Sequence, residues 1–190
     1  MVISAPKKRY VRCQVSDVAV LVDPPTGLKG TVILRTETPA PVSETAAPDT
    51  VYGAGEYEVE GIVVRGIQLG AESSESIVRT GYIAQMDDIS LGFFEAAQEG
   101  ELTQRSLETT TEIDILFISV GGGYLEPKKA VTFLKQFDPR CVVVVGESEK
   151  SAQDLADELG KKLETLEKLV VKKKDIDAQD GMKVIWMSEK

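Results

Sequence analysis

The side chains of this sequence that could do chemistry are carboxylates, lysines and hydroxyls, because its 190 residues include no histidine. Imidazole is the usual general base near neutral pH and the commonest metal ligand. Its absence excludes Ser-His-Asp triads, Cys-His pairs and zinc or iron sites held by histidine. Any catalysis would have to use the remaining groups.

Two pairs of carboxylates have a spacing that suits catalysis or cation binding. Glu56 and Glu58 are two apart in an alternating segment, so they share one face of an expected strand, and paired carboxylates act as acid and base in glycoside hydrolysis. Asp87 and Asp88 could bind a hard cation through oxygen. Each pair has a simpler explanation that we favour, namely a solvent-facing strand and a turn between two strands.

A run of three glycines at 121–123 follows an apolar segment and precedes an expected helix, as in loops that cradle phosphate. The run lacks the Gly-Lys-Ser/Thr ending of a P-loop, and its spacing is not GxGxxG. Glu126 and the formal net charge of -9 also disfavour a phosphate ligand. We therefore expect a tight structural turn.

Length and composition indicate one ordinary globular domain that spans residues 1–190. An acidic chain repels the phosphate backbone, so we expect no nucleic-acid partner. No apolar run approaches the roughly 20 residues of a membrane helix, so we expect no membrane partner. Cys13 and Cys141 both lie in apolar stretches outside any CxxC pair, which favours a reducing, cytoplasmic compartment.

The first half of the chain predicts a succession of strands with little helix. Alternating or β-branched apolar runs predict strands at 9–14, 18–22, 31–34, 56–59, 62–67, 77–85 and 89–94. Asp23 ends one of these strands before two prolines, and we expect its carboxylate to cap nearby backbone N–H groups. The segments 36–50 and 70–76 have no periodicity and are expected to be loops.

The second half alternates strands and helices. Unbroken apolar runs predict buried strands at 113–120 and 141–145, and weaker ones at 170–171 and 182–187. Apolar stripes at helical spacing predict helices over 127–137 and 151–166. The alternation indicates an α/β fold in this half.

Five segments occur in an order that resembles the metallo-β-lactamase fold superfamily, and in particular its small, single-domain zinc-dependent hydrolase group. They are Val-Asp-Pro at 22–24, Gly-Glu-Tyr-Glu-Val at 55–59, Leu-Gly at 91–92, the strand and triple glycine at 113–123, and Asp-Pro-Arg-Cys-Val-Val-Val-Val at 138–145. The resemblance implies an α/β fold, a four-layer αββα sandwich that is small and reduced in helices. It also implies a metal site on loops at one edge of the two sheets.

The positions that correspond to the family's metal ligands hold other residue types. The family motif Thr-His-x-His-x-Asp-His aligns with 36–42, the bridging aspartate follows Leu-Gly, and the last histidine ends the 141–145 strand. The corresponding residues, which define a vestigial cleft, are Glu37, Pro39, Pro41, Val42, Phe93 and Gly146. Only Glu37 has a donor atom for a metal, whereas a catalytic zinc needs about three protein ligands. Phe93 either plugs the cleft, partly exposed, or packs into the sheet core.

Three functions follow from this comparison, in order of preference. The first is a pseudoenzyme without metal, catalytic residues or cofactor, which acts by binding, scaffolding or assembly with a protein partner or a second copy. The second is a hydrolase-like enzyme with a site built on carboxylates, drawn from Glu37, Glu44, Asp49 and Glu72, near lysine or serine. The third is a small-ligand binding domain that uses the vacated cleft as an apolar pocket.

Overall fold

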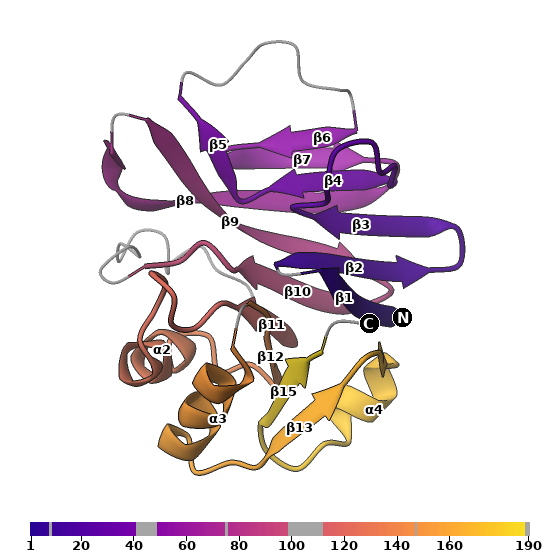
Figure 1. Ribbon diagram of the computed structural model, residues 1–190. Coiled ribbons are helices and arrows are strands. Elements are labelled where there is room, and N and C mark those ends of the chain that lie inside the picture. Colours follow the sequence, from indigo (N-terminus) through magenta and orange to yellow (C-terminus); the bar gives the residue numbers. More distant parts are fainter. Residues whose placement is uncertain (8, 41–48, 75, 99–111, 147, 189–190) are drawn as a thin grey trace.

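The computed structural model describes residues 1–7, 9–40, 49–74, 76–98, 112–146 and 148–188, with the backbone alone at 71–74. Two β-sheets face each other, and the few helices of the described residues lie mainly beside one of them (Figure 1). The two sheets and the few helices of the described residues confirm the predicted α/β sandwich that is reduced in helices.

The first sheet has six strands and is built mostly from the start of the chain. Its order is β14 (Leu169–Val170), β1 (Val2–Lys7), β2 (Tyr10–Val15), β3 (Val18–Val22), β4 (Val32–Arg35) and β6 (Thr50–Tyr52). The β-branched runs predicted at 18–22 and 31–34 are β3 and β4, which pair in parallel. The strand β1 was not predicted, because its sequence VISAPK mixes apolar, small and charged residues.

The second sheet has nine strands in the described part of the chain. Its order is β13 (Leu163–Leu166), β15 (Lys183–Met187), β12 (Cys141–Val144), β11 (Ile115–Ile118), β10 (Ile89–Phe94), β9 (Ile77–Met86), β8 (Ile62–Ser74) and β7 (Gly55–Val59), while β5 (Glu37–Pro39) pairs with β9. The strands from β10 to β13 pair in parallel, as the buried apolar runs at 115–118 and 141–144 require.

Two loop predictions are wrong, because backbone pairing with a distant strand decides them. The segment 70–76 was expected to be a loop, yet β8 continues to Ser74 and pairs with β9 beyond an irregularity in the register. The segment 36–50 contains β5, which pairs with the far end of β9, and its last residue begins β6. Polar residues conceal both strands in the sequence, since a β-ladder needs only backbone groups.

The helices are α2 (Pro127–Leu134), α3 (Glu149–Glu158) and α4 (Lys173–Asp177). The helix predicted over 151–166 is too long: it ends at Glu158, and Gly160 has a φ of 64°, the left-handed conformation common just after a helix. Leu163 and Leu166 continue the leucine spacing by coincidence and belong to β13. None of the described helices is long and apolar enough to cross a membrane.

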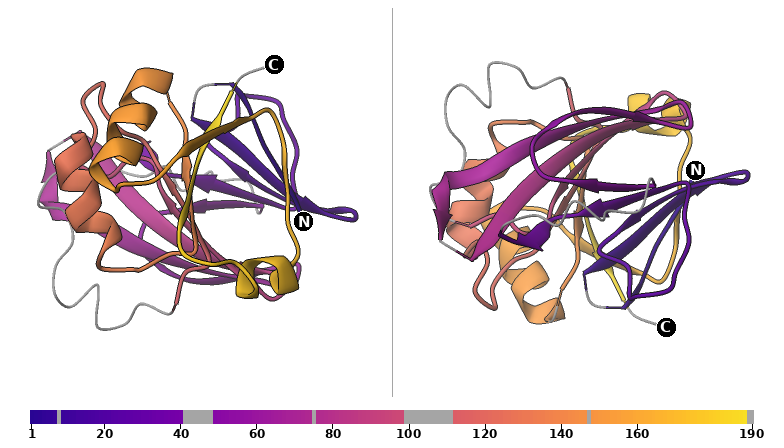
Figure 2. Two further views of the ribbon diagram at one scale, coloured as in Figure 1. Left: turned by 90° about the horizontal axis from the view of Figure 1, so that it is seen from below. Right: turned by 90° about the horizontal axis from the view of Figure 1, so that it is seen from above.

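Two apolar layers hold the sandwich together. One fills the space between the sheets, and the other lies between the nine-stranded sheet and α2 and α3, which cover its outer face (Figure 2). Phe93 is fully buried in the layer between the sheets, where its ring stacks on Phe117 with 4.8 Å between centroids. Of the two alternatives for Phe93, packing in the core is therefore confirmed, and a partly exposed plug is wrong.

The short helix α4 is tied to the sheet by one ion pair. The Nζ of Lys173 donates to both oxygens of Asp114, at 2.7 and 2.8 Å. Asp114 precedes β11 and also accepts from the backbone N–H of Ser90. These bonds lie at the amino ends of β10 and β11, so this acid serves the architecture.

Replacing Phe93 with alanine should lower the free energy of unfolding by about 3–5 kcal/mol, because the change removes a fully buried ring and leaves a cavity. Val63→Ala is the control, since Val63 is 54% exposed, and its cost should stay below about 1 kcal/mol. Urea denaturation measures both. Equal losses in the two variants would contradict the assignment of Phe93 to the core.

Candidate functional site

A guanidinium group lies where the edges of the two sheets meet. Arg9 follows β1 in the tight turn that leads into β2, and its φ of 60° places it in the left-handed region. The Nη1 of Arg9 donates to Oε2 of Glu37 in β5, at 3.0 Å. Since β2 belongs to the six-stranded sheet and β5 to the nine-stranded sheet, this ion pair links the two sheets.

Two further residues complete this arrangement, which we call the Arg9 cluster: Arg9, Glu37, Arg79 and Tyr124. The Nε of Arg79, in β9, lies 3.4 Å from the other oxygen of Glu37. The Arg9 guanidinium carbon lies 4.4 Å from the ring centroid of Tyr124, a cation–π distance. Arg9 is thus held by charge on one side and by an aromatic ring on the other.

The position of Arg9 keeps it charged and leaves one side of it unused. Burial lowers the pKa of Arg9, but Glu37 and the other nearby groups outweigh this effect, and the net pKa lies above the ordinary value. The Nε and Nη2 atoms of Arg9 are buried and have no hydrogen-bond partner among the described residues. These two N–H groups form one of the edges with which arginine grips a carboxylate or phosphate.

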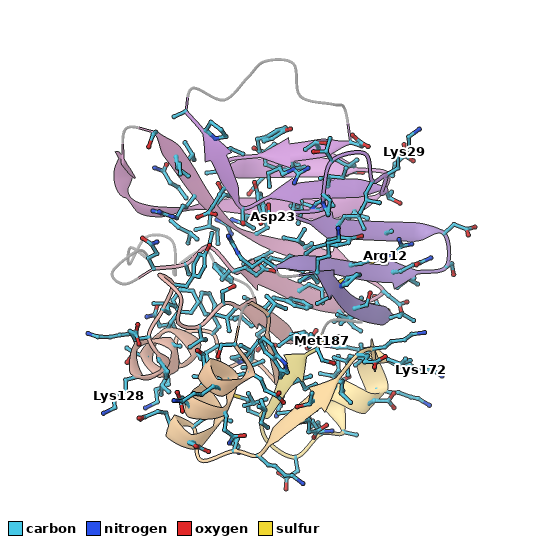
Figure 3. The ribbon with its side chains drawn as sticks, in the orientation of Figure 1. Arg12, Asp23, Lys29, Lys128, Lys172 and Met187 are labelled. Carbon is cyan, nitrogen blue, oxygen red and sulfur yellow. The ribbon has the colours of Figure 1, made fainter. Side chains whose placement is uncertain are left out.

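Asp23 organises the backbone next to this cluster. Its carboxylate accepts from the backbone N–H of Thr36 at 3.0 Å and also from the Thr36 hydroxyl. The predicted capping role of Asp23 is therefore confirmed, with Thr36 as the donor. In Figure 3 Asp23 lies in the middle of the molecule, whereas Lys29, Lys128 and Lys172 lie at its periphery. Burial raises the pKa of Asp23, and the bonds from Thr36 oppose the rise.

Glu95 is a buried acid directly after β10. Its side chain is fully buried, and neither carboxyl oxygen has a hydrogen-bond partner among the described residues. Burial raises the pKa of Glu95 well above the ordinary value; Asp23 adds to the rise, while Arg9 counteracts it. A charge in such a place is costly, so the folded protein favours the neutral acid.

A pocket of about 330 Å³ opens beside the Arg9 cluster, at the carboxyl ends of β11 and β12. We call it the glycine-turn pocket, because two of the three glycines at 121–123 lie in its wall. All three have a positive φ, between 61° and 96°, which confirms the predicted tight turn. The lining residues are Arg9, Ser119, Val120, Gly121, Gly122, Tyr124, Gly146, Ser148 and Ser151.

Two of the vestigial cleft positions meet at this place. Glu37 holds Arg9, and Gly146 lines the pocket together with Arg9. Phe93 is in the core, and Pro39 is exposed in β5. Pro41 and Val42 lie outside the described residues.

The other acidic candidates have structural roles or face solvent. Glu56 and Glu58 are exposed on β7. This agrees with the simpler explanation for the pair, a solvent-facing strand. Asp87 and Asp88 form a two-residue hairpin loop with φ values of 54° and 61°, so the turn predicted for them is confirmed. The Asp49 carboxylate accepts from Thr50, while Glu44 and the side chain of Glu72 lie outside the described residues.

The residues in this region do not fit a resident metal ion. The described residues contain no group of three or more His, Cys, Asp or Glu side chains that could hold one. Glu37, the one position with a suitable donor, is already engaged by two guanidinium groups, and Gly146 has no side chain. A guanidinium is permanently cationic and accepts no metal.

Comparison with known proteins gives the family of the chain. Residues 11–145 match the family described as the beta-lactamase superfamily domain, and this match extends over more than half of the sequence. The chain therefore belongs to the beta-lactamase superfamily, with a fold of the metallo-β-lactamase type. No curated protein matched the sequence.

Solved structures show the same fold at low sequence identity. A metallo-beta-lactamase superfamily protein from Thermotoga maritima superimposes with a TM-score of 0.73 at 14% identity, over 98% of this chain and 99% of that chain. The metallo-beta-lactamase fold protein YhfI from Bacillus subtilis gives 0.61 at 8% identity, over 100% and 97%. The metallo hydrolase Igni18 from Ignicoccus hospitalis gives 0.59 at 11% identity, over 90% and 99%.

Arg9, Glu95 and Tyr124 make up much of this site, and none of them was a candidate in the sequence. Arg9 begins the strand predicted over 9–14, and Glu95 follows an apolar strand without any motif. One signal was available for Glu95, since a charged residue between the apolar runs 89–94 and 96–97 is unusual. Nothing in the local sequence indicates which acid lies next to Arg9.

Glu95→Gln should change the pH dependence of stability. Because the folded state keeps the Glu95 proton to a higher pH than the unfolded state, the wild-type protein loses stability as the pH rises above the ordinary pKa of 4.5. Glutamine has no proton to release, so the loss disappears. Urea unfolding at several pH values should give a wild-type slope steeper than the variant slope by up to about 1.4 kcal/mol per pH unit.

Glu58→Gln is the matched control for this experiment, since it makes the same chemical change at an exposed position on β7. Its pH dependence should follow that of the wild type. If Glu95→Gln and Glu58→Gln give the same curve, Glu95 is not a buried neutral acid.

Proposed function

We propose that this protein is a pseudoenzyme of the metallo-β-lactamase fold, a domain that binds without catalysis and has an Arg–Glu cluster in place of the metal centre. The observation that carries the proposal is the Arg9–Glu37 ion pair. It joins the residue at the family's first ligand position to a permanent cation. The family assignment describes the fold, and the loss of catalysis is inferred from the side chains.

Electrostatics support this proposal. A divalent ion beside Glu37 would face Arg9 and Arg79, both of which already contact its carboxylate. Repulsion between like unit charges at about 4 Å amounts to roughly 4 kcal/mol in the effective dielectric of a protein surface. Metal binding would also take the Glu37 carboxylate away from two partly buried guanidinium groups, which costs further free energy.

The geometry gives less support to a carboxylate-based hydrolase. A general acid and base need a nucleophile or a substrate water within reach. Glu37 is engaged by arginines, the Asp49 carboxylate accepts from Thr50, and Glu95 is closed off from solvent. The small-ligand alternative fits better, although the glycine-turn pocket is lined by arginine, serine and glycine, whereas an apolar pocket was expected.

Purified protein should contain no stoichiometric zinc, iron or manganese after expression in metal-supplemented medium. Elemental analysis by mass spectrometry measures the metal content, and the melting temperature should be the same with and without a chelator. A hydrolase of the family that retains its histidine ligands is the positive control. One metal ion per chain, together with hydrolysis that the chelator abolishes, would contradict the proposal.

The binding role extends to a partner protein or a second copy of the chain, in a cytoplasmic setting. Cys13 and Cys141 are free and buried, which supports a reducing compartment. We expect self-association to be measurable by light scattering coupled to size-exclusion chromatography. A mass equal to one chain at all concentrations would contradict a homo-oligomer, and the partner would then have to be a different protein.

A further inference from the structure

We propose that the glycine-turn pocket binds the phosphate group of a small molecule. This inference rests on the proposed function, because a metal ion at Glu37 would displace Arg9 from the position that the pocket requires. The pocket has the features of a phosphate site on three levels: its place in the fold, its unpaired donors and its size.

The place in the fold favours an anion. Ligands of parallel sheets bind beyond the carboxyl ends of the strands, and the pocket lies beyond β11 and β12. The ten-residue helix α3 begins there, with Ser148 as its N-cap and Ser151 in its first turn, and both residues line the pocket. The amino end of a helix carries partial positive charge and free N–H groups.

The donors in the wall give independent evidence. Ser119 is 2% exposed, lines the pocket, and its Oγ has no hydrogen-bond partner among the described residues. Arg9 also lines the pocket, and its Nε and Nη2 atoms are buried without a hydrogen-bond partner among the described residues. A buried donor without a partner costs roughly 1–3 kcal/mol, so a ligand oxygen that reached these atoms would recover stability.

The backbone leaves room for the ligand beside these donors. Gly146 has a φ of 140°, and a Cβ placed on it would meet nothing closer than Ser119 Oγ at 3.9 Å. The family's last histidine would fill this space. The volume of about 330 Å³ equals that of roughly ten water molecules at about 30 Å³ each, enough for a phosphate and a small organic group.

The charge of the pocket wall is positive, whereas the net charge of the chain is -9, the value that disfavours a phosphate ligand when the sequence is considered alone. Glu126 is not in the pocket wall, and the Glu149 carboxylate accepts from Thr165 of β13. Among the described residues that line the pocket, Arg9 is the charged one. The lining offers many hydrogen-bond donors: one guanidinium edge, three serine hydroxyls and a helix end. A carboxylate has only two oxygens to accept from them, so a tetrahedral group with more oxygens is favoured.

The test is a titration of ¹⁵N-labelled protein with inorganic phosphate at constant ionic strength, followed by amide chemical shifts. We expect saturable shifts centred on Gly121, Gly122, Gly146 and Ser148. Acetate should bind more weakly than phosphate, and chloride should produce no such shifts.

Ser119→Ala is the decisive variant, because the Ser119 Oγ has no partner to lose among the described residues. Loss of one hydrogen bond to a charged ligand should weaken phosphate binding about tenfold or more. Ser90→Ala is the matched control: Ser90 is also buried with an unpaired Oγ, but it lies at the amino end of β10 and should leave the affinity unchanged. Arg9→Met should abolish binding in protein that retains the wild-type amide dispersion.

The outcomes separate this inference from the proposed function. Absence of saturable shifts, equal affinity in Ser119→Ala and wild type, or acetate binding as tight as phosphate would each overturn the phosphate site. Metal analysis of the same preparation decides the proposed function. If the protein is metal-free and does not bind phosphate, the phosphate site is contradicted and the proposed function stands. If the protein contains one metal ion per chain, the phosphate site and the proposed function are both contradicted.

Discussion

The ion pair between Arg9 and Glu37 joins the two sheets. It links the turn before β2 of the six-stranded sheet to β5 of the nine-stranded sheet. The resemblance to the metallo-β-lactamase fold places metal ligands on loops at one edge of the two sheets, where an ion would connect them. Here a side-chain cation makes this connection. Tyr124, from the glycine turn, holds the same guanidinium from another side and brings a third segment to the junction.

Replacing a metal ion with a guanidinium changes what the site can do. A metal accepts electron pairs and lowers the pKa of a bound water molecule, which are the properties that hydrolysis uses. A guanidinium only donates hydrogen bonds, and it stays protonated at any ordinary pH. In the proposed pseudoenzyme the positive charge at this edge is kept, and the chemistry left to it is recognition of an anion. The unpaired edge of Arg9 is consistent with this change.

Several polar groups near this junction are buried without a partner in the part of the chain that the structure describes, including both oxygens of Glu95 and the Oγ of Ser119. Buried groups of this kind are uncommon and lower stability. They lie where the fold family places its chemistry, whereas the layers on either side of the nine-stranded sheet consist of buried apolar side chains. Departures from good packing and full hydrogen bonding are typical of functional sites.

The sequence by itself determined the fold class, the buried strands predicted at 113–120 and 141–145, the glycine turn and the loss of the family's metal ligands. Each of these depends on residue type or local periodicity, which the chain carries in order. Only the tertiary structure decided that β5 pairs with β9, that Arg9 meets Glu37, and that Glu95 is buried near Arg9. Such contacts join positions 28 to 86 residues apart, and no local pattern specifies which distant charge will lie beside another. The missing histidines can thus be read from the sequence, but the arginine that pairs with Glu37 only from the fold.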